Sequence, residues 1–507
     1  MDLLSNLALG LQTAVSPLNL LYCFLGTLIG TLIGVLPGIG PVQTIAILLP
    51  ATFALPPVSA LIMLAGIYYG AQYGGSTTSI LVNVPGEASS VVTCLDGYQM
   101  ALKGRAGAAL TISALGSFVA GSFATLLLAI LAVPLSELAF KFGPAEYFSL
   151  MVFGLIGSIV FASESVIKAV GMILLGLLLG MVGTDITSGT QRFCFGIPEL
   201  VDGIGFVSLA MGLFGISEII KSLERKEKRS ILKSKISGFW MTKKELKASA
   251  PAVVRGTLTG SLLGILPGGG AILASFISYM LEKKISRDPE SFGKGNIRGV
   301  ASPESANNAA AQTAFVPLLT LGIPPNVVLA MMAGAMIIHG IQPGPRVITS
   351  NPSLFWGVIV SMWVGNLMLV ILNLPLIGIW VRLLSVPYRV LYPAILLFCC
   401  IGIYSINNNT FDIGLTALLG FLGYLFAKME CEPAPLILGF VLGPMMEENL
   451  RRAMLLSRGD PSVFFTRPLS LAFLLMAFAM LIIVAVPAIR RRRKDAFGQE
   501  REELPKK

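Results

Sequence analysis

Long runs of apolar residues occupy most of this chain, and polar positions are confined to short stretches between them. A helix needs about 20 consecutive apolar residues to cross the hydrocarbon core of a bilayer. Several of the runs are that long, so the pattern predicts a protein whose helices cross a membrane many times. The long apolar runs lie at about residues 14–36, 107–134, 144–182 (expected to be a pair of spans), 203–220, 252–281, 353–383, 389–407, 411–428, 433–446 and 467–489.

Five other apolar segments are too short to cross and are interrupted by Gly or Pro. Backbone groups freed at such interruptions need protein or water partners inside a membrane. We therefore expect re-entrant hairpins or discontinuous helices, which in secondary transporters tend to surround the substrate. These segments are residues 44–55, 58–69, 76–85, 312–323 and 325–338.

One segment of the sequence occurs twice. Residues 26–40 read GTLIGTLIGVLPGIG and residues 256–270 read GTLTGSLLGILPGGG, with ten of fifteen positions identical at a constant offset of 230. A weaker match pairs SILVNVPG at 79–86 with LLTLGIPP at 318–325. Because internal repeats are common in secondary transporters, we predict two membrane repeats.

Composition supports a membrane protein. Of the 507 residues, 54% are hydrophobic and only 13% are charged, and the mean hydropathy is +0.80. Soluble globular chains have about 25% charged residues. So few charges could not cover the surface of a soluble protein of this size, and the bilayer must act as the solvent for much of it.

The net charge of +10 is concentrated in two places. Ten Lys or Arg against three Glu lie between Lys221 and Lys247, and a basic run from Arg490 to Lys494 follows the last apolar run. Basic clusters beside spans mark the cytoplasmic side, an interpretation that we prefer to nucleic-acid binding. The central loop and the C-terminus are then cytoplasmic. Because the basic loop precedes only the second copy of the repeat, the two repeats are predicted to be inverted.

Enzymatic and tightly bound cofactor chemistry find little support in the sequence. The six cysteines are scattered without a C-x-x-C pair, and His339 is the single histidine. No G-x-S-x-G, H-E-x-x-H or G-x-x-x-x-G-K-[ST] motif occurs, which argues against hydrolase, zinc-peptidase and ATPase activity. We expect no cofactor and no catalytic residue.

Glycine dominates both copies of the repeat. Glycines four residues apart (Gly26, Gly30 and Gly34; Gly256, Gly260 and Gly264) predict close helix packing. Each copy then ends in a Pro-Gly break, where a ligand can approach the backbone and where the N–H groups of the next helix could hold an anion. A plain hinge is the alternative. The candidate substrate-binding glycines at these breaks are Gly38, Gly40, Gly268 and Gly269.

Polar residues at two further places are candidates for ligand contacts. Hydroxyls are costly in lipid unless they face a cavity or a partner helix. In the first half we assign substrate binding to Gly74, Gly75, Ser76, Thr77 and Ser79, with helix–helix hydrogen bonding as the alternative. In the second half we assign it to Asn307, Asn308, Thr320 and Gly322, with a polar cap at the cytoplasmic surface as the alternative. Side-chain and freed backbone carbonyls suit Na⁺, for which we expect a site near Asn83, Asn307, Asn308 and Thr320.

The motifs together resemble the TctA family over roughly residues 26–452. These motifs are G-x-L-P-G-x-G at 34–40, the Y-G-G-S run at 73–78, D-G-Y-x-M-A-x-K-G-R-A-G at 96–107, P-E-x-A-N-N-A at 303–309, L-G-x-P at 321–324, G-x-x-P-G-P at 340–345 and L-G-P-x-x-E-x-x-L-R-R at 442–452.

The resemblance implies the large membrane subunit of a tripartite tricarboxylate transporter. Such a subunit works with a small membrane subunit (TctB-like) and a periplasmic solute-binding protein (TctC-like) in the bacterial inner membrane. It imports citrate or a related carboxylate with a cation, Na⁺ in the best-known members. The fold implied is an all-α elevator-like carrier with two inverted repeats.

We therefore expect a first membrane repeat at residues 1–220, a basic cytoplasmic linker at 221–250 and a second membrane repeat at 251–450. A C-terminal transmembrane helix and basic tail follow at 451–507. A membrane-embedded enzyme that acts on a lipid-linked substrate is the alternative function, but it would need paired acids or a metal set that the sequence does not offer. A scaffold or receptor would not account for the duplicated broken helices.

Overall fold

The chain is almost entirely helical, as predicted. The structure is a computed structural model that describes residues 3–36, 40–161, 165–185, 188–224, 241–266, 270–383 and 388–485. Among these residues, a strand pair of two residues each, β1 (Gly183–Thr184) and β2 (Gln191–Arg192), is the exception to the all-α expectation.

The chain divides into two compact units, and each is built from two separate stretches. The first unit comprises Met1–Ala139 and Gly205–Leu425, and the second comprises Phe140–Ile204 and Phe426–Lys507. The two units are defined by which residues pack together and not by internal repetition. The expected boundaries of the repeats and the linker therefore stay a prediction. Most of the basic linker and the basic tail lie outside the described residues.

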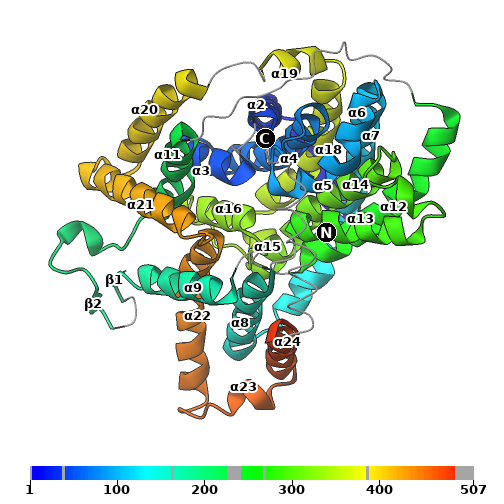
Figure 1. The fold of residues 1–507 in the computed structure, drawn as a ribbon. Helices are drawn as coiled ribbons and strands as arrows, with labels where there is room; N and C mark the ends of the chain where they lie inside the picture. The colour runs from blue at the N-terminus through cyan, green and yellow to red at the C-terminus, as the bar shows by residue number, and fades with distance from the viewer. Residues whose placement is uncertain are drawn as a thin grey trace. The chain divides into compact units, whose positions relative to one another are not determined.

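The first unit contains most of the helices (Figure 1). Its N-terminal stretch holds α1 (Leu3–Ala14), α2 (Pro17–Val35), α3 (Pro41–Thr52), α4 (Pro57–Val82), η1 (Ala88–Ser90), α5 (Val91–Thr93), η2 (Cys94–Tyr98), α6 (Gln99–Leu102) and α7 (Ala106–Ala139). Its second stretch holds α10 (Phe206–Ala210), η4 (Met211–Ile216), α11 (Ser217–Glu224), α12 (Lys243–Ile265), α13 (Gly270–Ile285), η5 (Pro289–Ser291), α14 (Arg298–Thr313), α15 (Phe315–Leu321), α16 (Val327–Ile338), α17 (Val347–Ser350), α18 (Pro352–Asn373), α19 (Ile377–Leu383), α20 (Tyr388–Asn407) and most of α21 (Thr410–Lys428).

The second unit is smaller. Its helices are α8 (Pro144–Phe161), α9 (Val166–Gly180), η3 (Pro198–Leu200), α22 (Ala434–Leu456), α23 (Val463–Thr466) and α24 (Pro468–Ala485). α22 packs against α8 and α9, and Gly176 of α9 allows its helix to approach the Leu436 carbonyl. Arg451 of α22 donates to Asp185 at 2.8 Å and to Glu447 at 2.6 Å, so the late L-G-P-x-x-E-x-x-L-R-R motif tethers α22 to the strand pair.

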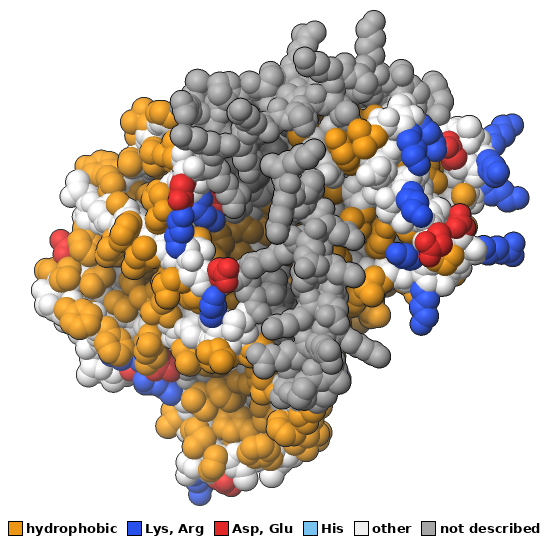
Figure 2. All heavy atoms as spheres, in the orientation of Figure 1, with side chains coloured by type: hydrophobic (Ala, Val, Ile, Leu, Met, Phe, Trp, Pro, Cys, Tyr) orange, Lys and Arg blue, Asp and Glu red, His pale blue; other side chains and the backbone are white. Residues whose placement is uncertain are grey.

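Four described helices have the length and hydropathy needed to cross a membrane: α2, α7, α18 and α21. Shorter apolar helices occur at Pro41–Thr52, Pro144–Ile159, Val166–Gly180, Val327–Ile338 and Pro468–Ile482. Hydrophobic side chains cover much of the visible surface (Figure 2). These features fit the predicted multi-span membrane protein.

One predicted interruption is wrong. Residues 58–69 and 76–85 were expected to be separate short segments, but α4 is continuous from Pro57 to Val82. Gly66, Gly70 and Gly74 face the backbone of α2, where a Cβ on Gly74 would lie 2.3 Å from the Thr31 carbonyl oxygen. The glycines therefore permit close helix packing, which outweighs their low intrinsic helix propensity.

The glycine rows of the two repeats pack in the same way, as predicted for close helix contacts. A Cβ on Gly26, Gly30 or Gly34 of α2 would lie within 2.5 Å of a carbonyl oxygen of α4, and one on Gly256, Gly260 or Gly264 of α12 within 2.4 Å of a carbonyl oxygen of α14. The facing carbonyls belong to Met63, Ile67 and Ala71 and to Ser302, Ala306 and Ala310.

The two sets of carbonyls are 239 positions apart, since 302 − 63, 306 − 67 and 310 − 71 all equal 239. The weaker sequence match has the same offset, since 318 − 79 equals 239. The ends of the helices follow it too: Asn83 after α4 has φ 58° and Gly322 after α15 has φ 76°. The contacts therefore extend the correspondence between the α2–α4 and α12–α14 pairs beyond the residues that match in sequence.

Candidate functional site

The hydroxyl run of the first half lies inside α4 and is buried. Ser76 and Ser79 donate to carbonyls one turn earlier, Gln72 and Gly75, each at 2.9 Å. Thr78 donates to the Val35 carbonyl of α2 at 2.8 Å. Helix hydrogen bonds thus account for much of the run, and Ser76 is distinguished by a second partner that is acidic.

That partner is Glu304 of α14, whose side chain is 1% exposed. Its carboxyl oxygens contact three hydroxyls: Ser76 on α4, Thr93 on α5 and, at 3.3 Å, Ser113 on α7. The three hydroxyls come from three different helices. A single carboxyl group therefore joins α14 to both α4 and α7 inside the first unit.

Polar residues continue from Glu304 along one face of α14. Residues four apart share a helix face, and here they are Glu304, Asn308 and Gln312. Asn308 donates to Ser117 at 2.7 Å, and Thr125 lies 3.4 Å from the Gln312 side-chain oxygen. We call this buried row the polar seam. Its members are Glu304, Asn308 and Gln312 of α14 and Ser113, Ser117 and Thr125 of α7.

A second carboxyl group, Glu87, lies beside the seam in the connection between α4 and η1. Asn307 donates to it at 3.0 Å, and Ser89 also contacts it. Its side chain packs on Gly75, where a Cβ would lie 2.8 Å from Glu87 Cγ. Burial raises the pKa of Glu87 to about 7, and the nearby Glu304 adds to the rise, against the effect of the hydrogen bonds from Ser89 and Asn307.

No ion pair among the described residues includes Glu304 or Glu87. Glu282 of α13 shows the contrast, because it is equally buried but bonds Arg255 at 2.8 Å and Arg298 at 2.6 Å. An ionised carboxylate inside a protein is costly unless a cation accompanies it. Glu304 has three hydroxyl neighbours in place of a described base.

The other predicted site residues have varied positions. Thr320 is buried and donates to Val316 at 2.7 Å, whereas Asn83 ends α4 with an exposed side chain. Gly40 is the N-cap residue of α3, and its main-chain N–H donates to the Gln43 side chain at 3.1 Å. Gly74 faces α2, as described above. Gly38, Gly268 and Gly269 lie outside the described residues.

Two of the sequence motifs meet in space. Gly322 of L-G-x-P approaches the segment that contains G-x-x-P-G-P, and a Cβ on it would lie 2.5 Å from the Pro343 carbonyl oxygen. Its φ of 76° also favours glycine. This glycine is therefore needed for backbone geometry.

The D-G-Y motif connects the two halves of the first unit. Asp96 is buried and accepts from the main-chain N–H groups of Gly293, Gly295 and Asn296 at 2.7 to 3.0 Å, and from the Tyr279 hydroxyl at 3.0 Å. Four donors satisfy this carboxylate fully. Its role is to position these segments.

The sequence analysis assigned no role to Glu304, Glu87, Thr93 or Ser113. A signal for Glu304 was present, since an acidic residue in a membrane region is a candidate functional group by itself. Thr93 and Ser113 could not be found in this way, because only the fold brings them to the carboxyl group. Among the described residues, no group of three or more His, Cys, Asp or Glu side chains could hold a metal ion.

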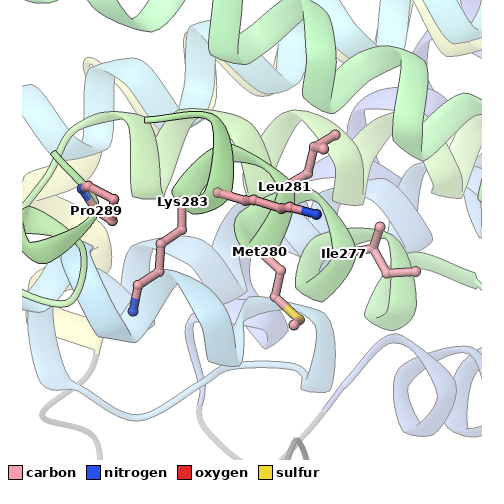
Figure 3. A pocket seen from close by; sticks show the side chains of 6 residues that line it. Ile277, Met280, Leu281, Lys283 and Pro289 are labelled. Atoms are coloured by element: carbon pink, nitrogen blue, oxygen red, sulfur yellow. The ribbon is translucent and has the colours of Figure 1, made fainter. Parts of the chain in front are cut away.

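A cavity of about 520 Å³ lies elsewhere, along α13 and the loop that follows (Figure 3). It is lined by Ile277, Met280, Leu281, Lys283, Lys284 and Pro289, none of which belongs to the polar seam. Met280 is 61% exposed and Ile277 37% exposed. The lining is partly exposed and, apart from its two lysines, apolar, unlike the buried oxygen-rich site.

The site in the first unit is thus a buried group of neutral donors and acceptors around two carboxyl groups. Hydroxyl, amide and carboxyl oxygens bind protons or alkali cations well. No nucleophile–base pair of the kind needed for covalent catalysis occurs in it. The arrangement suits reversible binding.

Comparisons with known proteins identify the family to which this chain belongs. A family model described as "Tripartite tricarboxylate transporter TctA family" matches residues 20–438. The chain is 59% identical over 500 residues to an "uncharacterized 52.8 kDa protein in TAR-I ttuC′ 3′ region" of Agrobacterium vitis, covering 99% of this chain and 100% of that protein. A second Agrobacterium vitis protein, from the TAR-II ttuC′ 3′ region, is 59% identical over 241 residues, 48% of this chain and 100% of its own length. No solved structure matches.

Proposed function

The chain belongs to the tripartite tricarboxylate transporter TctA family, and from that premise we propose that it imports citrate or a related carboxylate together with a cation, Na⁺ being the first to test. As a member it is a membrane transport component and not an enzyme. Family membership also implies a tripartite system with TctB-like and TctC-like partners and a carboxylate substrate. The individual substrate and the coupling ion are our proposal.

The observation that supports cation coupling is Glu304, a buried carboxyl group surrounded by neutral donors. A carboxylate substrate brings negative charge into a low-dielectric region, where it is costly without compensation. A cation bound at Glu304 keeps this group from adding a further negative charge beside the substrate. The gradient of the cation then drives uptake, without ATP.

For the substrate we propose the region of the two Pro-Gly breaks, with Gly38 and Gly40 in one half and Gly268 and Gly269 in the other. Free N–H groups at the starts of α3 and α13 would face the anion there. Gly75, Ser76 and Asn307 lie beside the carboxyl groups and are proposed to connect substrate and cation binding.

We further propose that the two corresponding helix pairs are inverted repeats that move as an elevator-like carrier in the bacterial inner membrane, with the C-terminus in the cytoplasm. The repeated glycine packing supports this, because rigidly packed helix pairs can move as bodies. The basic clusters support the orientation.

The test is uptake of labelled citrate into proteoliposomes that contain this chain and its two partners. We expect accumulation that requires an inward Na⁺ gradient and the binding protein. Uptake of another carboxylate, or with a proton gradient, would change the substrate or the ion of the proposal. No uptake of any carboxylate under any gradient, with the complex assembled, would contradict it.

A further inference from the structure

Glu304 differs from the other buried acids of the first unit in what surrounds it. Asp96 is satisfied by main-chain N–H groups and a tyrosine, and Glu282 by two arginines. Glu304 has three hydroxyl neighbours and no base within ion-pair distance among the described residues. Unlike Asp96 and Glu282, Glu304 therefore has neither main-chain N–H groups nor a described base to balance its charge, and its neighbour Glu87 also has no ion-pair partner among the described residues.

The number of hydroxyl hydrogens available to the acceptors around Glu304 indicates the protonation state of its carboxyl group. The Ser76 hydroxyl has one hydrogen but two acceptors, the Gln72 carbonyl at 2.9 Å and Glu304 Oε2. If Ser76 donates to Gln72, the contact with Glu304 needs a hydrogen on the carboxyl group. A protonated Glu304 that donates to Ser76 satisfies all three groups at once.

A second observation points to a cation. Three oxygens close to the two carboxyl groups are buried and have no hydrogen-bond partner among the described residues: Tyr73 Oη, Asn307 Oδ1 and Asn308 Oδ1. Tyr73 is one turn before Ser76 on α4, and the two asparagines follow Glu304 on α14. Buried polar atoms are normally satisfied, and unsatisfied neutral oxygens beside a carboxyl group are ligands that an alkali cation prefers.

The titratable groups around Glu304 are few. The groups whose charge interacts with Glu304 are Tyr73 of α4, Glu87 before η1, and Cys94 of η2. α7 contributes the hydroxyls of Ser113 and Ser117. On α12, α13 and α14, Arg255 and Arg298 both pair with Glu282. A proton on Glu304 therefore responds mainly to Glu87 and to any cation that enters.

We propose that Glu304 is a cation-exchange site that holds one monovalent cation at a time. In the arrangement described here it holds a proton. Na⁺ binds to the carboxylate and to the neighbouring neutral oxygens and displaces it, so that –COOH and Na⁺ give –COO⁻·Na⁺ and H⁺. The net charge of the buried site stays the same throughout. This inference rests on the proposed cation coupling and identifies the group responsible.

The experiment measures protons released on addition of Na⁺ to the purified chain in weakly buffered solution, with a pH-sensitive dye and with choline as the control cation. Because metal binding to a protonated ligand releases its proton, we expect about one proton per chain with Na⁺ and none with choline. Glu304→Gln should abolish the release. Glu245→Gln, which removes a carboxyl group of a partly exposed ion pair with Arg105, should leave it unchanged.

No carboxylate substrate is present in this measurement, so its outcome is independent of the uptake experiment. Release without citrate uptake would support the exchange site while contradicting the proposed substrate. Uptake without Na⁺-dependent release, or release that persists in Glu304→Gln, would overturn the assignment of Glu304.

A second pair of variants keeps the test valid if Glu304→Gln does not fold, as judged by size-exclusion chromatography. Ser76→Ala and Thr93→Val retain the carboxyl group and remove one neutral oxygen each. Loss of a group that orients a metal ligand weakens binding roughly 10- to 100-fold, so each should raise the Na⁺ concentration for half-maximal release by about tenfold. An unchanged concentration in both variants would overturn the proposal.

Discussion

The pairs α2–α4 and α12–α14 have the same glycine packing but different chemistry on the neighbouring helix face. At the offset of 239, the face of α14 with Glu304, Asn308 and Gln312 corresponds to Ala65, Tyr69 and Tyr73 of α4. The first copy therefore has one small and two aromatic residues where the second has an acid and two amides.

The packing partners of these faces differ as well. α14 packs against α7, whereas α4 packs against α18. Tyr69 fills the space above Gly365 of α18, where a Cβ would lie 2.7 Å from its ring. Glu304 and Asn308 instead contact Ser113 and Ser117 of α7. The comparison indicates that the repeated contacts between glycines and carbonyls maintain the scaffold, while the faces beside them determine binding.

The largest effect is expected where both copies are alike. Gly260→Leu places a side chain against the Ala306 carbonyl, 2.2 Å from the new Cβ, and Gly30→Leu does the same at Ile67, at 2.5 Å. Backbone cannot yield as a flexible side chain can, so each change should cost about 3 kcal/mol or more. We expect loss of folded protein in both variants, measured as the monodisperse fraction after detergent extraction.

Gly414→Leu is the matched control, because a Cβ on this glycine of α21 meets nothing within 4 Å. It should be extracted like the wild type. A folded Gly260→Leu together with an unfolded Gly30→Leu would show that the two scaffolds are not equivalent.

The next-largest effect should distinguish the first copy of the repeat from the second. Gly75→Leu directs a side chain at Glu87, with Cγ at 2.8 Å and the main-chain N at 3.3 Å from the new Cβ. Most of this contact is with a flexible side chain, so the protein should fold while the carboxyl group is displaced. We expect citrate uptake to be abolished with normal membrane insertion. The corresponding position is Ala314, where the second copy already has a side chain. Normal uptake by Gly75→Leu would contradict the placement of the site.

The scaffold was more predictable than the site. Glycines at i, i+4 and i+8 predicted close packing, and the weak match between 79–86 and 318–325 already had the offset at which the packed carbonyls correspond. The continuity of α4 could not be predicted, because local propensity disfavours a helix through Gly74 and Gly75, and the close contact of Gly74 with α2 depends on the fold.

The partners of Glu304 show why the site was less accessible from sequence. Ser76, Thr93 and Ser113 precede it by 228, 211 and 191 positions, and no local pattern relates these residues. The sequence analysis assigned substrate binding to Ser76, Thr77 and Ser79 alike. In the structure Thr77, Thr78 and Ser79 donate only within α4 or to neighbouring segments of the first half, and of this run only Ser76 contacts an acid.

A moderate effect is expected from the polar seam. Asn308→Ala removes the donor to Ser117, whose side chain is 1% exposed. An unsatisfied buried polar group costs about 1 to 3 kcal/mol, so the variant should melt several degrees lower. In a double-mutant cycle with Ser117→Ala, measured by thermal unfolding in detergent, the coupling should be about 1 kcal/mol. Additive effects of the two changes would mean that this hydrogen bond contributes nothing to the seam.

The smallest effect concerns Glu87, and its counterpart makes the test specific. The corresponding residue of the second copy is the neutral Asn326, whose side chain accepts from the Leu329 N–H at 3.0 Å at the start of α16. Burial raises the pKa of Glu87 to about 7, above its ordinary value. The folded state then holds a proton that the unfolded state has released, so stability falls as pH rises from about 4.5 to 7 and stays low above that range. Glu87→Gln cannot lose a proton and should escape this fall.

We expect the melting temperatures of the variant and the wild type to agree near pH 4.5, and that of the variant to be about 2 °C higher near pH 8. Glu245→Gln, which removes a carboxyl group paired with Arg105 away from this site, serves as the control. An equal difference between Glu87→Gln and wild type at both pH values would mean that Glu87 is ionised throughout, and that the first copy tolerates a buried charge where the second has none.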